Sequence, residues 1–297
     1  TGDHTLAGLG RLLQGAGGAV PLVGAVYIVS KYFPPAKSAT LIGATQMFGM
    51  AGGFAGQFAV GPVIGSGFPW QQFWIITGIT GIFLGLFLWL FLPKEDKSEI
   101  PERSLRSIFD AFKSVVTNPQ SLLCGFIAAL IFIPTTIFDM VWGVRFIQDG
   151  YGFDYGEAVL RASAVPFGWI IGCPLLGYVS DRIGRRKPVI IGGTVVLLLC
   201  LAGALYGRVG LLPPYSIALL IGIASGAGMI PYTVIKESNP PQLSGTATGV
   251  ANFINFTFSA VMGQIFGWLL LTVSHGSGKL MITDYRMTFG PLLFGLM

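Results

Sequence analysis

Five charges occupy a short turn between two long apolar runs, and this pattern leaves few folds open to the chain. Residues 177–187 read GYVSDRIGRRK and hold four cations and one carboxylate. The runs on either side, Ala158–Val179 and Pro188–Tyr206, each approach the roughly 20 apolar residues that a helix needs to cross a bilayer. A charged turn between two such runs must lie at a membrane surface. Because Lys and Arg in short loops resist translocation, the cations predict the cytoplasmic surface.

Composition indicates the same class of protein. Hydrophobic residues make up 53% of the 297 residues and charged residues only 10%, with a mean hydropathy of +0.71, whereas soluble globular domains average about 25% charged residues. The chain has too little polar surface for a soluble globule, so we predict an all-α polytopic membrane protein. The formal net charge of +5 comes mostly from loops predicted on one face, so it does not indicate nucleic-acid binding.

Hydropathy predicts eight full membrane-spanning helices. They cover residues 6–29, 41–64, 73–92, 121–147, 159–179, 188–206, 215–235 and 249–273. A ninth apolar run begins near Met287 and reaches only Met297, about half the length needed to cross. With alternating helices, 12 of the 18 Lys and Arg residues fall on one side. This bias predicts that side to be cytoplasmic.

The charged turn resembles the signature of a known family. Its pattern G-x-x-x-D-R-x-G-R-R-K is similar to the loop motif of the major facilitator superfamily, a family of twelve-helix secondary transporters. Val179 stands where that family usually has Leu. A plain basic membrane loop would explain the cations but not two glycines and an aspartate at this spacing. The matching residues, which the resemblance implies to be a gating loop, are Gly177, Asp181, Arg182, Gly184, Arg185 and Arg186.

A ten-residue pattern occurs twice in the chain. Residues 34–43 and 240–249 share five identities, at an offset of 206 residues (240 − 34), where about one is expected by chance from background frequencies of about 5 to 7%. Both copies lie between two predicted helices. Members of the superfamily consist of two similar six-helix halves with the substrate site between them. The offset is about half the length of such a protein.

The resemblance also implies a register. Asp181 would join the family's eighth and ninth helices, so the first span would be the family's fourth, with three helices before Thr1 and an incomplete last helix. The sequence around Arg11 and Gln14 is similar to the R-x-x-Q-G signature of that fourth helix.

This register predicts three parts of the chain. Residues 1–92 would belong to the N-terminal helix bundle, 93–120 to a cytoplasmic linker and 121–297 to the C-terminal bundle. Within the linker, residues 105–116 alternate charged and apolar residues. They predict either a short interfacial helix or a solvated segment.

Two charged residues lie well inside predicted spans, where a charge costs about 2.5 to 3.5 kcal/mol on insertion scales. By resemblance, Arg11 would face the central cavity and bind an anionic group; the alternative is a structural role satisfied by Gln14 and backbone carbonyls. Asp139 lies between Pro134 and Gly143, which make its helix easy to bend. Burial favours the neutral carboxyl, so we expect Asp139 to carry a proton or bind substrate, with helix capping as the alternative.

Neutral side chains complete the predicted site. Gln46 and Asn252 occupy equivalent positions of the repeat (252 − 46 = 206), so two amides would hold a substrate from both halves. Hydrogen bonding between helices is the alternative role for each amide. The remaining candidates would stack on a substrate or hydrogen-bond to it: Trp142, Trp169, Gln14, Tyr232 and Asn255.

The pattern of residues does not predict an enzyme. The three cysteines lie inside apolar runs, and neither a metal-ligand spacing, a phosphate loop nor a nucleophile elbow is found. We therefore expect no catalytic residue, metal or cofactor. The resemblance implies a monomeric secondary active transporter of the plasma membrane, or of the inner membrane in a bacterium. It would move a small polar solute, anionic if Arg11 binds it, by alternating access coupled to protons or a counter-solute. A non-transporting membrane receptor or scaffold is the alternative.

Overall fold

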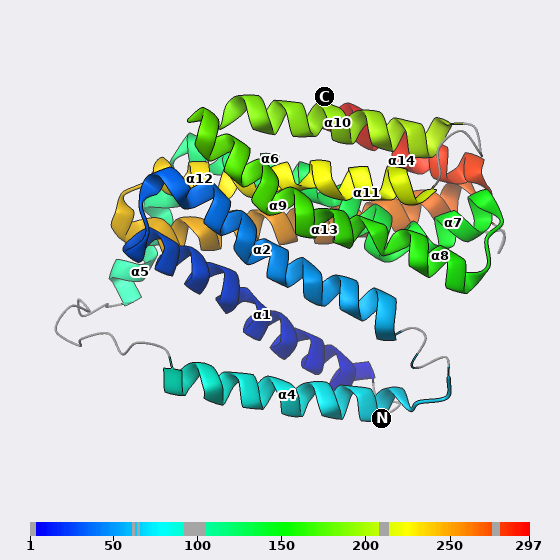
Figure 1. Cartoon of the computed structure of the whole chain (residues 1–297), viewed down its shortest axis with the longest axis horizontal. Helices are drawn as coiled ribbons and strands as arrows, with labels where there is room; N and C mark the ends of the chain where they lie inside the picture. The colour runs from blue at the N-terminus through cyan, green and yellow to red at the C-terminus, as the bar shows by residue number, and fades with distance from the viewer. Residues whose placement is uncertain (1–3, 61–62, 64–65, 92–104, 208–213, 275–279) are drawn as a thin grey trace.

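Helices account for all regular structure in the part of the chain that the computed structural model describes, residues 4–60, 63, 66–91, 105–207, 214–274 and 280–297. The helices lie side by side along one long direction (Figure 1). The α-helices are α1 (His4–Tyr32), α2 (Ser38–Ala55), α4 (Trp70–Phe91), α5 (Leu105–Val116), α6 (Pro119–Ile133), α7 (Val144–Tyr151), α8 (Tyr155–Ala162), α9 (Ala164–Ile183), α10 (Lys187–Tyr206), α11 (Pro214–Ser225), α12 (Ile230–Glu237), α13 (Ser244–Val273) and α14 (Ile282–Leu296). Short 3₁₀ or π segments are η1 (Pro35–Lys37), η2 (Gly56–Val60), η4 (Pro134–Gly143), η5 (Gly226–Met229) and η6 (Pro241–Leu243).

Seven helical stretches within the described residues are long and apolar enough to cross a membrane. They match seven of the eight predicted spans and confirm the all-α polytopic class. The predicted span 41–64 is not among them: α2 and η2 cover its first part, and residues 61–62 and 64 lie outside the description. Glycine, serine, threonine and glutamine in α2 lower its hydropathy. The stretches are Gly8–Tyr32, Trp70–Phe91, Pro119–Tyr151, Tyr155–Ile183, Lys187–Tyr206, Tyr215–Glu237 and Pro241–Val273.

Local residue chemistry sets several helix ends. The side chain of Asn118 accepts a hydrogen bond from the Gln120 backbone N–H (3.0 Å), and Pro119 follows as the first residue of α6. At the other end of a helix, Gly184 follows α9 with a left-handed backbone (φ +67°). A side chain would strain this conformation. The second glycine of the charged turn is therefore needed to end α9 before α10 begins.

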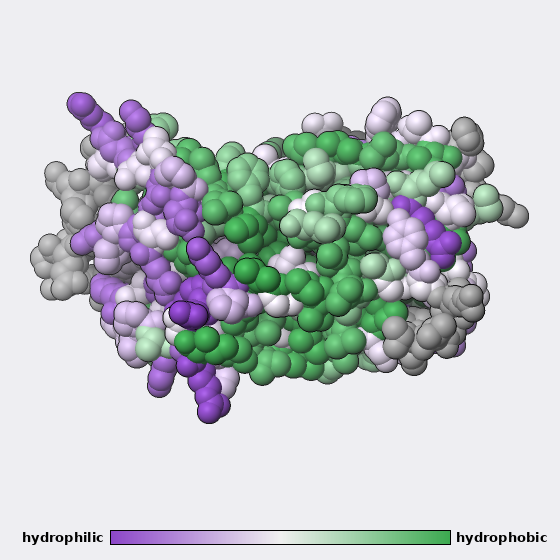
Figure 2. Space-filling view, turned by 90° about the horizontal axis from the view of Figure 1, so that it is seen from above, coloured by the Kyte–Doolittle hydropathy of each residue, from purple (hydrophilic) through white to green (hydrophobic). Residues whose placement is uncertain are grey.

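Hydrophobic side chains form a belt across the middle of the molecule, and hydrophilic ones gather mainly at one end (Figure 2). At that end the start of α2 meets the ends of α9 and α12. We call it the cationic end, because Lys37, Arg186 and Lys236 lie there. The belt and the charged end are those of a protein that crosses a membrane.

Residues 105–116 form a helix, α5. A helix here was one of the two alternatives that the sequence left open. Val115 on this helix is fully buried, whereas Phe109 is 71% exposed. The rest of the predicted linker before α5, residues 93–104, lies outside the description. Helix α5 thus joins the bundle at its last turn and leaves apolar side chains uncovered along the rest.

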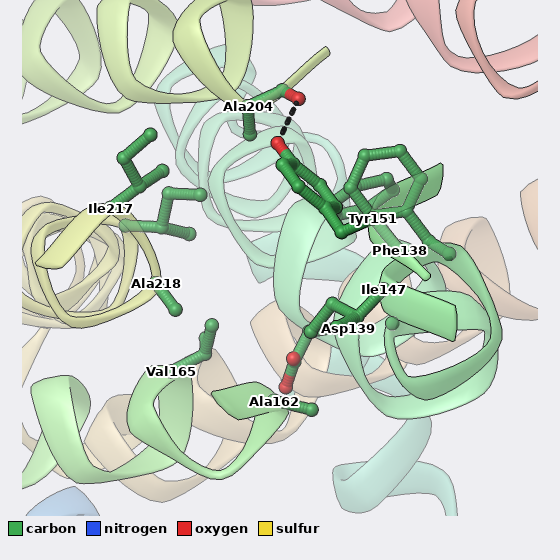
Figure 3. A pocket seen from close by; sticks show the side chains of 12 residues that line it. Phe138, Asp139, Ile147, Tyr151, Ala162, Val165, Ala204, Ile217 and Ala218 are labelled. Atoms are coloured by element: carbon green, nitrogen blue, oxygen red, sulfur yellow. Dashed lines mark hydrogen bonds between the residues drawn. The ribbon is translucent and has the colours of Figure 1, made fainter. Parts of the chain in front are cut away.

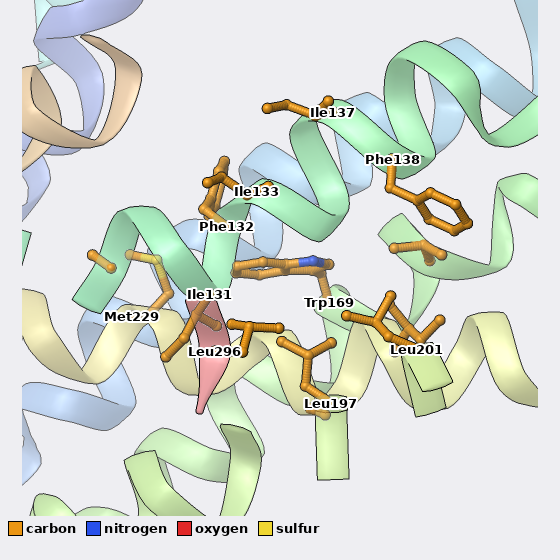
Figure 4. Close-up of a cluster of buried hydrophobic side chains, with 14 of the residues drawn as sticks. Ile131, Phe132, Ile133, Ile137, Phe138, Trp169, Leu197, Leu201, Met229 and Leu296 are labelled. Carbon is orange, nitrogen blue, oxygen red and sulfur yellow. The ribbon is translucent and has the colours of Figure 1, made fainter. Parts of the chain in front are cut away.

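The C-terminal helices pack around Trp169 of α9, whose side chain is fully buried (Figure 4). Its indole Nε1 donates a hydrogen bond to Thr135 Oγ1 (2.8 Å). Helix α9 approaches α11 closely, because a Cβ added at Gly172 or Gly222 would overlap the facing backbone. The N-terminal helix α4, by contrast, has no buried residue.

Candidate functional site

The charged turn joins helices that are far apart in the sequence. Asp181, near the end of α9, accepts hydrogen bonds from Thr40 N (2.8 Å), Thr40 Oγ1 (2.7 Å) and Ala39 N (3.3 Å) at the start of α2. Backbone N–H groups in the first turn of a helix have no partner within the helix, and the helix dipole favours a negative charge there. Asp181 therefore caps α2 from a different helix.

Arg186 extends this contact to a third helix. Its Nη1 pairs with Asp181 Oδ1 (2.6 Å) and its Nη2 with Glu237 Oε1 (2.7 Å), while Lys236 Nζ donates to Ser38 Oγ (2.8 Å). Burial lowers the pKa of Arg186, but the hydrogen bonds and charges of Glu237 and Asp181 outweigh burial and hold that pKa above its usual value. Arg186 thus stays a cation. We call these five residues the latch.

Two glycines allow the helices beneath the latch to touch. A Cβ at Gly177 would overlap the carbonyl of Ala39, and one at Gly43 would overlap the carbonyl of Cys173. Of the predicted gating residues, Gly177, Asp181 and Arg186 therefore meet at the contact between α2 and α9, while Gly184 ends α9. The side chains of Arg182 and Arg185 are exposed and form no hydrogen bond or ion pair with the described residues.

A central cavity lies between the N-terminal helices α1 and α2 on one side and α12 and α13 on the other. It consists of two adjoining hollows of about 400 and 580 Å³, which share Gly18, Asn252 and Phe256. Four of the predicted substrate residues line the first hollow: Gln46, Tyr232, Asn252 and Asn255. Among the described residues that line the two hollows, none is charged.

The polar residues of the cavity form a short hydrogen-bonded chain. Tyr232 Oη donates to Asn252 Oδ1 (2.7 Å), and Asn255 Nδ2 donates to Tyr232 Oη (3.4 Å). Asn255 is 1% exposed, and its Oδ1 has no partner. A buried acceptor without a donor is costly and calls for an explanation. A ligand hydroxyl in the cavity would supply that donor, and Gln46 faces the same hollow from α2.

The other predicted substrate residues lie away from this cavity. Arg11 donates to Gln14 Oε1 (3.2 Å) and lies 5.6 Å from the centre of the Trp74 ring of α4. These contacts fit the structural role that was the alternative to binding an anion. Trp169 is in the core, and Trp142 does not line either hollow.

The aromatic surface of the cavity comes instead from four phenylalanines that sequence reasoning missed. One signal was available, because Phe256 lies four residues after Asn252, on the same face of α13. The four are Phe48, Phe132, Phe253 and Phe256.

Asp139 lies in a separate, small pocket of about 40 Å³ within the C-terminal helices (Figure 3). The pocket shares no lining residue with the central cavity. Asp139 is 4% exposed, and its Oδ2 has no hydrogen-bond partner. The residue belongs to η4, a π-helical segment from Pro134 to Gly143, at the place where the sequence predicts an easily bent helix. Such segments are frequent at functional sites.

Within the described residues, His, Cys, Asp and Glu form no group of three or more that would hold a metal ion. Cys124 and Cys173 are buried, Cys200 is half-buried, and all three are free thiols. The chemistry available in the central cavity is therefore hydrogen bonding and aromatic contact.

Comparison with known proteins identifies the family. The model of the Major Facilitator Superfamily matches residues 5–264. Similar proteins include a hexuronate transporter of Bacillus subtilis, 23% identical over 89% of this chain and 66% of that protein, and sugar transporter ERD6-like 8 of Arabidopsis thaliana, 25% identical over 90% and 65%. A gentisate transporter of Corynebacterium glutamicum is 23% identical over 86% and 58%.

The chain spans about two thirds of the length of the first two of these relatives. No solved structure matches it. Since the family model covers most of the chain, and the capped latch and two-sided cavity accord with it, the chain belongs to the major facilitator superfamily.

Proposed function

We propose that the protein is a secondary active transporter that moves a small polar solute across a membrane by alternating access. The observation that carries the proposal is the central cavity, because equivalent positions in the two halves of the repeat each contribute a polar group to it: Gln46 on α2 and Asn252 on α13. The relatives named above are transporters of hexuronate, sugar and gentisate. In this proposal residues 1–92 and 121–297 belong to the two bundles that rock about the cavity.

The cavity favours a neutral, hydroxylated solute such as a sugar over an anionic one. Its amides and its tyrosine hydroxyl can exchange hydrogen bonds with sugar hydroxyls, while Phe132 and Phe256 offer rings for the apolar face of a sugar. Arg11, the cation expected to bind an anion, stacks on Trp74 outside the cavity lining. No other charged group lines the described part of the cavity.

The latch supports alternating access. Its bonds join α2 to α9 and α12 at the cationic end. We place this end on the cytoplasmic side of the plasma membrane, or of the inner membrane in a bacterium. These bonds exist only while that end is closed. They therefore stabilise the closed state relative to the open one, and a substrate shifts the balance through its different affinity for the two states.

Counterflow tests the proposal. Purified protein is reconstituted in liposomes loaded with an unlabelled neutral hexose, and the entry of labelled hexose is followed. We expect transient accumulation that protein-free liposomes do not show, and weaker accumulation with a hexuronate or an aromatic acid. If no solute accumulates but one raises the Tm of the protein, a membrane receptor or scaffold replaces the transporter.

A further inference from the structure

The carboxyl of Asp139 is buried in surroundings that offer its Oδ2 no donor. The carboxyl points toward Ala162 and Val165, and the other pocket walls are apolar (Figure 3). The second titratable group in the pocket is Tyr151, whose hydroxyl already donates to the carbonyl of Ala204 (3.0 Å). Neither a hydrogen bond nor an ion pair from the described residues therefore neutralises this oxygen.

Charged and titratable groups on the elements around the pocket are engaged elsewhere. On α8, Arg161 lies 3.7 Å over the Phe153 ring and donates to the carbonyl of Glu157. Helices α9, α10 and α11 contribute only apolar residues to the lining, and α13 faces η4 with the Ser259 hydroxyl, 3.5 Å from Thr136 Oγ1. The remaining groups, on α7 and α14, pair with one another, cap their own helix or donate to a backbone carbonyl: Arg145 pairs with Asp149, Tyr285 pairs with Asp149, Asp284 accepts from the Met281 N–H, and Arg286 Nε donates to the Leu205 carbonyl (2.6 Å).

An ionised carboxylate that is buried without a partner costs several kcal/mol. In the conformation described, Asp139 is therefore the neutral acid. It becomes a carboxylate when water reaches it. The π-helical turn of η4 offers a way for water to enter, because such turns can change register more easily than regular α-helix.

A series of contacts connects the central cavity with the helix that carries Asp139. Phe256 and Phe132 line the cavity, with ring centroids 6.4 Å apart. Phe132 packs edge-on against Trp169 (5.0 Å), and Trp169 Nε1 donates to Thr135 Oγ1 (2.8 Å). Figure 4 shows Trp169 beside Phe132 and Phe138. Thr135 precedes Asp139 by four residues in η4, so movement of the cavity wall reaches the segment that holds the carboxyl.

We propose that Asp139 is a proton-binding site outside the solute cavity, coupled to it through Trp169 and Thr135. This inference rests on the proposed transport function. When the pocket opens to one face, the Asp139 O–H bond breaks and the proton passes to water. When it opens to the other face, the carboxylate takes a proton from water and the O–H bond forms again. No electrons are transferred. Trp169 and Thr135 are positioning residues, and only Asp139 holds the proton.

Asp139→Asn tests the proton site. Counterflow and accumulation driven by an imposed pH gradient are measured in the same liposomes. We expect counterflow within about twofold of wild type and loss of pH-driven accumulation, because an amide cannot carry the proton. Wild-type protein without counterflow contradicts the transport function itself. Wild-type counterflow without pH-driven accumulation, or a variant that keeps such accumulation, overturns the role of Asp139 alone.

A second variant guards against misfolding of the first. Asp139→Glu retains a carboxyl group in the pocket, and we expect it to keep pH-driven accumulation at a reduced rate. In infrared spectra, the band of a protonated carboxyl in wild type should shift in Asp139→Glu. A wild-type band at neutral pH that this substitution leaves unchanged refutes the proton site.

Thr135→Val tests the coupling. It keeps the side-chain shape but removes the acceptor for Trp169. We expect the Kd for solute to lose most of its pH dependence while counterflow persists, since coupling between proton binding and solute binding is reciprocal. Thr136→Val is the matched control, because the neighbouring hydroxyl faces Ser259 on α13 (3.5 Å). It should retain wild-type pH dependence. A Thr135→Val protein with wild-type pH dependence rules out this route.

Discussion

The latch and the central cavity both lie where the N-terminal helices meet the C-terminal ones, but they differ in whether their buried polar groups have hydrogen-bond partners. At the latch, Asp181 receives three hydrogen bonds and an arginine, and only 6% of its side chain is exposed. In the cavity, Asn255 is buried too but leaves its Oδ1 unpaired. The first arrangement stabilises one conformation. The second loses stability that a ligand can restore.

This contrast yields a rule for substitutions. Changes at the latch should alter stability and conformational balance, with solute binding little affected. Changes in the cavity should alter solute binding, with stability unchanged or improved.

Gly177→Ala should have the largest effect. The added methyl group would overlap the Ala39 backbone, and overpacking of this kind costs about 1 to 3 kcal/mol. We expect a lower Tm and a loss of counterflow of tenfold or more. Gly192→Ala on α10 is the control, because nothing lies within 4 Å of the new methyl group. Equal Tm values for the two variants would show that α2 and α9 do not need to touch.

Asp181→Asn should follow. It removes the charge that caps α2 and leaves Arg186 with Glu237 as its one charged partner, at a cost of about 1.5 to 3 kcal/mol for hydrogen bonds to a charged group. We expect a roughly tenfold slower counterflow and a solute Kd within about threefold of wild type. Arg182→Gln is the control, because the Arg182 side chain is exposed and forms no hydrogen bond or ion pair with the described residues. It should behave as wild type. A large change in the Kd of Asp181→Asn would remove the distinction between latch and cavity.

Asn255→Leu should separate binding from stability. It removes a buried acceptor without a partner, so we expect an unchanged or higher Tm. Loss of the solute's hydrogen bonds should weaken binding about tenfold, which corresponds to about 1.4 kcal/mol. Binding is measured by titration and stability by thermal unfolding. Ser259→Ala on the same helix, outside the cavity lining, serves as the control. Wild-type affinity in Asn255→Leu would exclude this amide from the solute site.

Glu237→Gln should have the smallest effect. The Glu237 side chain is 38% exposed, and pairs of that kind contribute about 0 to 1 kcal/mol. We expect a Tm within a few degrees of wild type and a difference that shrinks as salt is added, because salt screens exposed charges. A decrease in Tm as large as that of Asp181→Asn would mean that Glu237 contributes as much to the stability of the latch as Asp181 does.

Some parts of the site could be predicted from the sequence. The repeat placed Gln46 and Asn252 at equivalent positions, and both line the cavity. The resemblance of the charged turn singled out Asp181 as part of a gating loop, but not the helix that it contacts. Arg11 and Trp169, by contrast, do not line the cavity. Hydropathy gives the depth of a residue along a span but not the direction of its side chain around the helix axis.

The all-α membrane class, most of the spans, the family and the glycine that ends α9 could be inferred from the sequence, because length, apolar composition and a left-handed turn are local properties of the chain. Helix packing in three dimensions was needed to show which side chains share the cavity, that Asp181 caps a helix 141 residues away, and that Asp139 has its own pocket. Each of these depends on how helices rotate and pack against one another. That rotation is set by contacts between residues far apart in the sequence, such as Gly177 against Ala39.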